Sequence, residues 1–199
     1  MILAAGESQR MGTPKPYLQI EKKSFVQIIT ENMKTCGADL PGFIVFNEQH
    51  RIFKDSLQIS DFIFVSNNRQ ELGQIYSLQL ALYQLPRETS GILFSLADHP
   101  LVQTETYTIL SDQHRKCPDR ILIPCFKGKK GHPCVFPSCI FREILLFSPE
   151  KPGGMKNILH SMEQRILKLD VDDSGILADL DTPKDLERYG LNTKETDLR

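Results

Sequence analysis

The chain of 199 residues has a formal net charge of −1, with 40% hydrophobic and 25% charged residues. This length fits one domain with a full core, and the neutral balance argues against a nucleic-acid-binding protein, which would carry a basic face. No apolar run approaches a membrane span and the start lacks a secretion signal, so we expect a cytoplasmic protein without a membrane segment. Five cysteines without a C-x-x-C pair favour free thiols in a reducing compartment.

The first 18 residues, MILAAGESQRMGTPKPYL, hold the densest functional signal. A short apolar run at residues 2–5 predicts the end of a buried strand, and Gly6, Arg10, Gly12 and Lys15 follow it. Glycines let backbone N–H groups approach an anion, and the basic side chains add positive charge. The pattern favours a phosphate-binding loop over a basic surface turn. Its spacing matches neither the P-loop nor the G-x-G-x-x-G fingerprint.

Apolar runs and helical patterns alternate along the rest of the chain. Ser24 is a suitable N-cap for a helix that Gly37 ends. Further helices are expected near residues 48–57, 73–85, 104–116, 141–147, 155–162 and 183–189, and strands near 43–46, 62–65, 91–96, 121–124, 134–136 and 166–171. This alternation is typical of a three-layer α/β/α fold with a mostly parallel sheet. We expect one domain over residues 1–190 and a polar tail over 191–199.

Asp98 follows the apolar run 91–96 in the sequence LADHPLV. An acidic residue at the carboxyl end of a buried strand lies where open α/β sheets bind ligands. One carboxylate there suits Mg²⁺, which keeps water and phosphate oxygens as its other ligands. A turn or helix cap before Pro100 is the alternative role. We expect His99 only to flank the site.

Three further stretches bring polar residues to the ends of predicted elements. Gly73 and Ser77 open a helix whose free N–H groups suit an anion or a base edge. Gly131 and His132 lie in a basic, glycine-rich loop, where a ligand contact and a solvated turn are both open. The sequence DLDTPKDL at residues 179–186 contains a strong helix start.

These motifs together resemble the MobA-like and MocA-like NTP transferase family, the nucleotidyltransferases of the molybdenum cofactor. LAAGESQRMGTPK at residues 3–15 is similar to nearly the whole signature loop of that family. LADHPLV, the GHP stretch at 131–133 and DLDTPKDL extend the resemblance along the chain. It implies a Rossmann-like nucleotidyltransferase topology and transfer of a nucleotide from an NTP to a phosphorylated acceptor, with release of pyrophosphate.

The resemblance also implies roles for individual residues. Arg10, Lys15 and Asp98 would carry catalysis, with Arg10 and Lys15 on the triphosphate. Asp98 and Asp181 would hold Mg²⁺, with Asp179 as the alternative to Asp181. The nucleotide would be lined by Leu3, Ala4, Ala5, Gly6, Arg10, Gly12, Lys15, Gly73 and Ser77. Gly131 and His132 would lie on the acceptor side.

The Ala4–Ala5 pair resembles the cytidylyltransferase version of the loop, whereas guanylyltransferases tend to have two glycines. The resemblance therefore implies CTP as donor and molybdopterin as acceptor, with a molybdoenzyme or its chaperone as a further candidate partner. Residues 151–156, KPGGMK, depart from the acidic and basic element of relatives and leave the acceptor open. The alternatives are a nucleotidyltransferase for sugar phosphates or other small metabolites, and a nucleotide-binding accessory protein without turnover.

Overall fold

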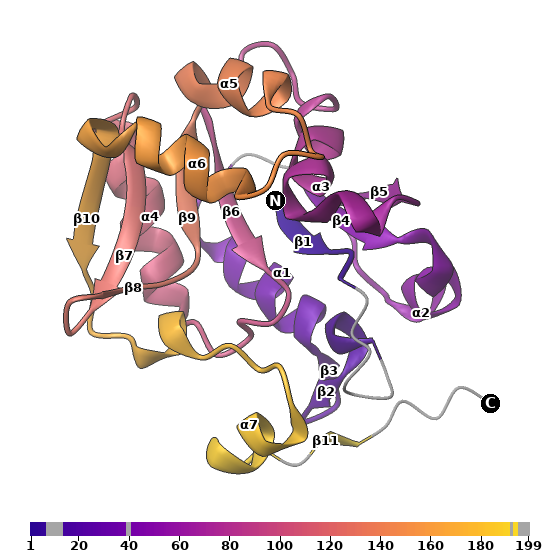
Figure 1. Cartoon of the computed structure of the whole chain (residues 1–199). Coiled ribbons are helices and arrows are strands. Elements are labelled where there is room, and N and C mark those ends of the chain that lie inside the picture. The colour runs from indigo at the N-terminus through magenta and orange to yellow at the C-terminus, as the bar shows by residue number, and fades with distance from the viewer. Residues whose placement is uncertain (7–13, 39–40, 192, 195–199) are drawn as a thin grey trace.

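The computed structural model describes residues 1–6, 14–38, 41–191 and 193–194. The strands of its main sheet are β1 Ile2–Ala4, β4 Gly42–Asn47, β5 Phe62–Asn67, β6 Gly91–Leu96, β7 Ile121–Phe126, β8 Lys129–Lys130, β9 Cys134–Pro137 and β10 Ile166–Asp170. Their order is β10-β7-β9-β6-β1-β4-β5, and β8 pairs with β7 (Figure 1). β9 is antiparallel to β6 and β7, whereas the pairs β1–β4, β1–β6, β4–β5 and β7–β10 are parallel. The predicted mostly parallel sheet is confirmed.

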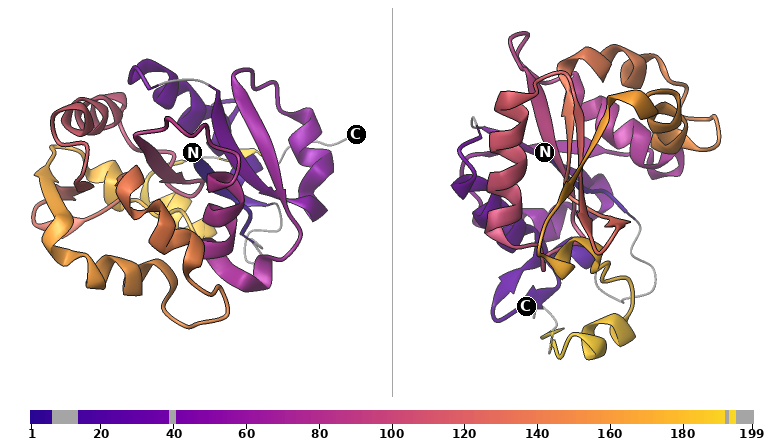
Figure 2. Two further views of the ribbon diagram at one scale, coloured as in Figure 1. Left: turned by 90° about the horizontal axis from the view of Figure 1, so that it is seen from above. Right: turned by 90° about the vertical axis from the view of Figure 1, so that its left-hand side faces the viewer.

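Helices cover both faces of this sheet (Figure 2). One face carries α1 (Phe25–Thr35) and α4 (Thr104–Lys116), the other carries α3 (Gly73–Leu82), α5 (Phe141–Leu146) and α6 (Gly154–Ser161), and the short α2 (Arg51–Ser56) follows β4. Side chains that alternate along a strand enter different cores. Ile2 packs with the apolar residues of α1, whereas Leu3 packs with those of α3. This alternation in strands buried on both sides produces the predicted three-layer α/β/α arrangement.

Two helix starts follow directly from their sequences. Before α1, Ser24 Oγ accepts a hydrogen bond from the Gln27 N–H (3.2 Å), and the Gln27 side chain accepts one from the Ser24 N–H (2.8 Å). Before α7 (Pro183–Arg188), the Asp185 carboxylate accepts one from the Thr182 N–H (2.7 Å). Both are capping boxes, which satisfy N–H groups that the first helical turn leaves unpaired. The N-caps predicted at Ser24 and Thr182 are confirmed.

A small second sheet ties the end of the chain to its beginning. It joins β2 (Gln19–Ile20), β3 (Lys23–Ser24) and β11 (Thr193–Lys194), in the order β11-β2-β3. β11 lies within residues 191–199, which the sequence analysis treats as a polar tail, and it pairs with β2 in antiparallel fashion. In the described part of the chain, none of the helices has the length and apolar character that crossing a membrane requires.

Beyond β10, the chain crosses the carboxyl ends of the strands before it reaches α7 (Figure 1). Asp173, which is 2% exposed, accepts hydrogen bonds from the Gln103 N–H (2.9 Å) and the Thr106 hydroxyl (2.6 Å) at the start of α4. Further along, the Leu180 N–H donates to the carbonyl oxygen of Asp98 (3.0 Å). These bonds attach the crossing chain to the loop that follows β6.

We call residues 173–180 the crossing segment. Its backbone approaches its neighbours so closely that a Cβ on Gly175 would lie 2.1 Å from the carbonyl oxygen of Leu101. A substitution there forces the two backbones apart, because backbone atoms do not yield as a flexible side chain does. On the other side, the carbonyl oxygen of Ile176 accepts a hydrogen bond from the His132 N–H (3.0 Å). The crossing segment therefore joins the loop after β6 to the loop before β9.

Replacement of Asp173 should loosen this junction. Asp173→Ala removes the acceptor of three donors, which are the Gln103 N–H, the Thr106 hydroxyl and the Gly175 N–H. Each unsatisfied buried donor costs about 1–3 kcal/mol, so the free energy of unfolding should fall by roughly 3 kcal/mol or more. Asp172→Ala removes the same charge from an exposed neighbour and should cost less than about 0.5 kcal/mol. Urea unfolding of both variants measures the difference. Small and equal losses would contradict the anchoring role of Asp173.

Candidate functional site

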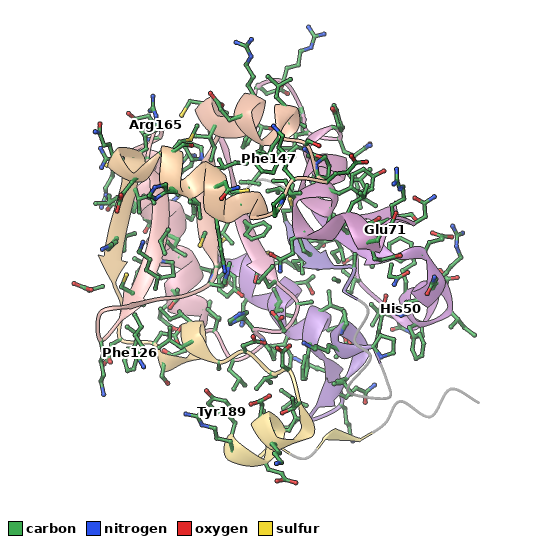
Figure 3. All side chains as sticks on the ribbon, in the orientation of Figure 1. His50, Glu71, Phe126, Phe147, Arg165 and Tyr189 are labelled. Atoms are coloured by element: carbon green, nitrogen blue, oxygen red, sulfur yellow. The ribbon has the colours of Figure 1, made fainter. Side chains whose placement is uncertain are left out.

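The candidate site lies at the carboxyl edge of the sheet. In Figure 3, Arg165 marks the amino end of β10 and Phe126 marks the carboxyl end of β7, and the site lies on the Phe126 side. Asp98 and His99 follow β6, and Asp179 comes from the crossing segment. One ligand atom from each of these three side chains lies within 4.8 Å of the other two. Residues far apart in sequence meet here because parallel strands end at one edge of a sheet.

These three residues differ in exposure: Asp98 is half-buried, His99 is buried and Asp179 is exposed. Burial raises the pKa of Asp98, against the opposite effect of the Lys15 charge. The pKa of Asp179 is raised first by burial and then by the Asp98 carboxylate. Within the described residues, Asp98 Oδ1 and His99 Nδ1 are buried, and Asp98 Oδ1 has no hydrogen-bond partner. The donor set fits a divalent cation, because an ion there would neutralise the carboxylates and give Asp98 Oδ1 a partner.

Asp181 makes a different contact. Its carboxylate forms an ion pair with Lys15, the first residue of a 3₁₀ turn, and its N–H donates to Asp185 Oδ2 at the start of α7 (3.2 Å). The sequence analysis takes Asp181 as the second metal ligand and Asp179 as its alternative. The structure brings the alternative, Asp179, to Asp98 and brings Asp181 to Lys15. The role of Asp181 on a metal stays a prediction.

The strand that begins the predicted phosphate loop is part of the core. Residues 3–5 are at most 7% exposed, so they belong to the core, and their contact with a nucleotide stays a prediction. Gly6 is exposed, and a Cβ there would meet nothing within 4 Å. Arg10 and Gly12 lie outside the described residues, and their phosphate contacts stay predictions.

The start of α3 is supported by side-chain amides that the sequence analysis did not single out. Gly73 has φ +71°, which glycine adopts without the strain a side chain would add. Ser77, 5% exposed, accepts a hydrogen bond at Oγ from Asn67 Nδ2 (2.8 Å). Asn47 lies opposite Asn67 in the β4–β5 register and accepts a hydrogen bond from Gln70 Nε2 (2.6 Å). The sequence did contain a signal for Asn47 and Asn67, since each asparagine ends an apolar strand.

At Gly131 and His132, the loop before β9 is packed against the crossing segment, whereas residues 127–130 are exposed. A Cβ on Gly131 would lie 2.2 Å from the carbonyl oxygen of Ile176, so glycine permits this close approach. The ring centroid of His132 lies 5.2 Å from that of His99 and 6.0 Å from that of Phe94. Burial lowers the pKa of His132 to about 4, with a further lowering by His99 and an opposing effect of Asp98. The predicted contact of this loop with an acceptor stays a prediction.

His99, which we expect from the sequence only to flank the site, has a ring nitrogen in the same group as Asp98 and Asp179. It is 6% exposed, and burial lowers its pKa, opposed by the charge of Asp179. A buried histidine beside two carboxylates cannot be recognised from the local sequence, because Asp179 is distant along the chain. Only the fold brings these groups together.

Comparison with known proteins yields one family and several solved structures with the same fold. A family model described as "MobA-like NTP transferase domain" matches residues 1–166. A curated protein named "Probable molybdenum cofactor guanylyltransferase", from Natranaerobius thermophilus, is 28% identical over 130 residues. That alignment covers 64% of this chain and 60% of the relative, so the chain matches less than two thirds of the relative's length.

Solved structures show the same fold at lower sequence identity. Rv0371c from Mycobacterium tuberculosis H37Rv has a TM-score of 0.79 and 24% identity, over 94% of this chain and 95% of that chain. A complex of Rv0371c with manganese has a TM-score of 0.75 and 23% identity, over 94% of each chain. These similarities agree with the architecture derived from the strands and helices above.

His132 should make stability depend on pH in mild acid. Its pKa of about 4 in the fold lies below the ordinary value of 6.5, so the unfolded state binds the extra proton between these values. Its contribution is complete above about pH 6.5 and is lost as the pH falls towards 4, by roughly 2 kcal/mol between pH 6.5 and 5. Urea unfolding at several pH values should therefore show that the free energy of unfolding of His132→Gln depends less steeply on pH than that of the unaltered protein. His160→Gln, on the exposed side of α6, is the matched replacement. Identical slopes for His132→Gln and the unaltered protein would contradict the expectation.

Proposed function

The chain belongs to the MobA-like NTP transferase family, and we propose that it transfers a nucleotide from an NTP to a phosphorylated small molecule and releases pyrophosphate. The observation that carries this proposal is the meeting of Asp98, Asp179 and His99 at the carboxyl edge of the sheet. Lys15, whose charge acts on all three, adds a cation beside them. Charge of both signs beside a strand-to-loop junction suits a triphosphate and its counter-ion.

In the proposed reaction, an oxygen of the acceptor phosphate attacks the α-phosphorus of the NTP. A new P–O bond forms, the bond from the α-phosphorus to the β-bridging oxygen breaks, and pyrophosphate leaves with the electron pair. A phosphate nucleophile is already ionised near neutral pH, so no side chain has to remove a proton from it. Catalysis then rests on positioning and on neutralisation of the triphosphate charge. Lys15 supplies one positive charge for this purpose.

The carboxylates of Asp98 and Asp179 are the proposed ligands of Mg²⁺. Bound there, the ion would neutralise phosphate oxygens and orient them, as divalent cations do in phosphoryl transfer. Asp181 is proposed to hold Lys15 in position through their ion pair. The alternative, that Asp181 itself completes the metal site, leads to a different response to mutation.

CTP is the proposed donor, on the resemblance of the Ala4–Ala5 pair to the cytidylyltransferase loop. GTP is the other candidate, since the curated relative is named a guanylyltransferase. Molybdopterin is the proposed acceptor, and residues 151–156 are where this chain departs most from the expected motif. A molybdoenzyme or its chaperone is the proposed recipient of the product. These substrates define the experiment.

Pyrophosphate release tests the function directly. The protein with Mg²⁺ and molybdopterin should release pyrophosphate faster with CTP than with GTP, because the donor site would fit cytosine. Release with a sugar phosphate but not with molybdopterin would assign the other acceptor class. Faster release with GTP would overturn the cytidylyl assignment. Binding of both nucleotides without any release would favour an accessory protein.

Single substitutions separate the two metal assignments in the same assay. Asp98→Asn and Asp179→Asn keep the side-chain size but remove a charged ligand, so turnover should fall by ~100-fold or more in each. The double variant should lose little more, because either change already disables the shared ion. Asp181→Asn should raise the KM for the nucleotide with a smaller fall in kcat, because it acts through Lys15. A kcat loss for Asp181→Asn that exceeds that for Asp179→Asn would assign the metal to Asp181.

A further inference from the structure

His99 places one ring nitrogen beside a carboxylate of the candidate site. It is 6% exposed, and its Nε2 lies 3.7 Å from Asp98 Oδ1. That distance is too long for a hydrogen bond. Its other ring nitrogen, Nδ1, is buried. Burial lowers the pKa of His99 and a backbone hydrogen bond with Gly175 raises it, so the ring has a partner on the crossing segment while Nε2 lies beside Asp98.

The spacing of His99 fits coordination of a shared cation. Metal bonds to imidazole nitrogen and carboxylate oxygen are about 2.0–2.2 Å long, so two ligands of one ion lie at most roughly 4.4 Å apart. The 3.7 Å between His99 Nε2 and Asp98 Oδ1 falls within this range. Asp179 supplies the third ligand atom within 4.8 Å, so at most a small closure brings all three onto one ion.

We propose that His99 is the third protein ligand of the divalent cation and sets which cation the site prefers. This inference rests on the cation site of the proposed function. Mg²⁺ strongly prefers oxygen ligands, whereas imidazole suits later first-row ions, whose affinity for nitrogen exceeds that of Mg²⁺. A site with two carboxylates and one imidazole therefore binds Mn²⁺ or Co²⁺ more tightly than Mg²⁺. The neutral imidazole adds a ligand without adding negative charge.

His132 is the alternative nitrogen ligand for the cation and also provides the control variant. Its ring centroid lies 5.2 Å from that of His99, and its own ring also faces the cluster closely enough for Asp98 to affect its pKa. The ligand atoms of Asp98, His99 and Asp179 form one group, and His132 is not part of it in the described structure. The two histidines therefore give matched variants, His99→Gln and His132→Gln, with the same change in size and chemistry.

The test is electron spin-echo envelope modulation of Mn²⁺ bound to the protein, without nucleotide because a base would add nitrogen of its own. The unaltered protein should show ¹⁴N modulation from a directly bound imidazole. Growth with ¹⁵N-histidine should change the pattern to that of ¹⁵N without any mutation. His99→Gln should remove the modulation, and His132→Gln should keep it. Modulation that survives in His99→Gln but disappears in His132→Gln would overturn the assignment.

Competition between Mn²⁺ and Mg²⁺, followed by the signal of free Mn²⁺, gives the second readout. His99→Gln offers an amide oxygen in place of nitrogen, so its Mn²⁺ affinity should fall by roughly 10-fold or more, since loss of even an outer-shell partner costs 10–100-fold. Its Mg²⁺ affinity should change less. Tight Mn²⁺ binding without nitrogen modulation would overturn the role of His99 and leave the two-carboxylate site intact. Failure of Mn²⁺ to bind at all would overturn both.

Discussion

The hydrogen bond from the Leu180 N–H to the Asp98 carbonyl oxygen, 3.0 Å long, is the contact on which the site depends. It holds the crossing segment against the loop after β6 and so sets Asp179 beside Asp98. The buried carboxylate of Asp173 and the close approach of Gly175 to Leu101 support the same junction. Asp173 and Gly175 are not among the proposed ligands of the cation, so their role is to hold the crossing segment in position. Loss of this junction separates the two halves of the site without touching either carboxylate.

The sequence predicts the architecture well, since it depends on local patterns. Apolar runs mark the strands of the main sheet except the two-residue β8, and the capping residues Ser24 and Thr182 begin their helices as expected. The two-residue strands β2, β3 and β11 carry no apolar pattern, and their pairing depends on tertiary contacts. The site was predicted only in part. Asp98 is recognisable because it ends an apolar run, whereas the choice between Asp179 and Asp181 depends on how the crossing segment lies.

The two aspartates that flank Leu180 have different charged neighbours. Asp179 lies with Asp98: burial raises the pKa of both carboxyl groups, and the Asp98 charge further raises that of Asp179, so this pair favours a cation between them. Asp181 instead neutralises Lys15 and leaves that lysine close enough to affect Asp98. In the proposed reaction, an incoming triphosphate would compete with Asp181 for Lys15. The same loop would thus supply Asp179 to the proposed cation and Asp181 to the lysine that the proposed triphosphate contacts.

The central claim is that Asp98 and Asp179 hold the divalent cation on which nucleotide transfer depends. A crystal of the protein with Mn²⁺ and a non-hydrolysable CTP analogue tests it by anomalous diffraction at the manganese edge. One strong anomalous peak is expected about 2.0–2.3 Å from a carboxylate oxygen of each residue, with the His99 imidazole and triphosphate oxygens completing the shell. A peak bound by Asp98 and Asp181, or one away from Asp98 altogether, would contradict it.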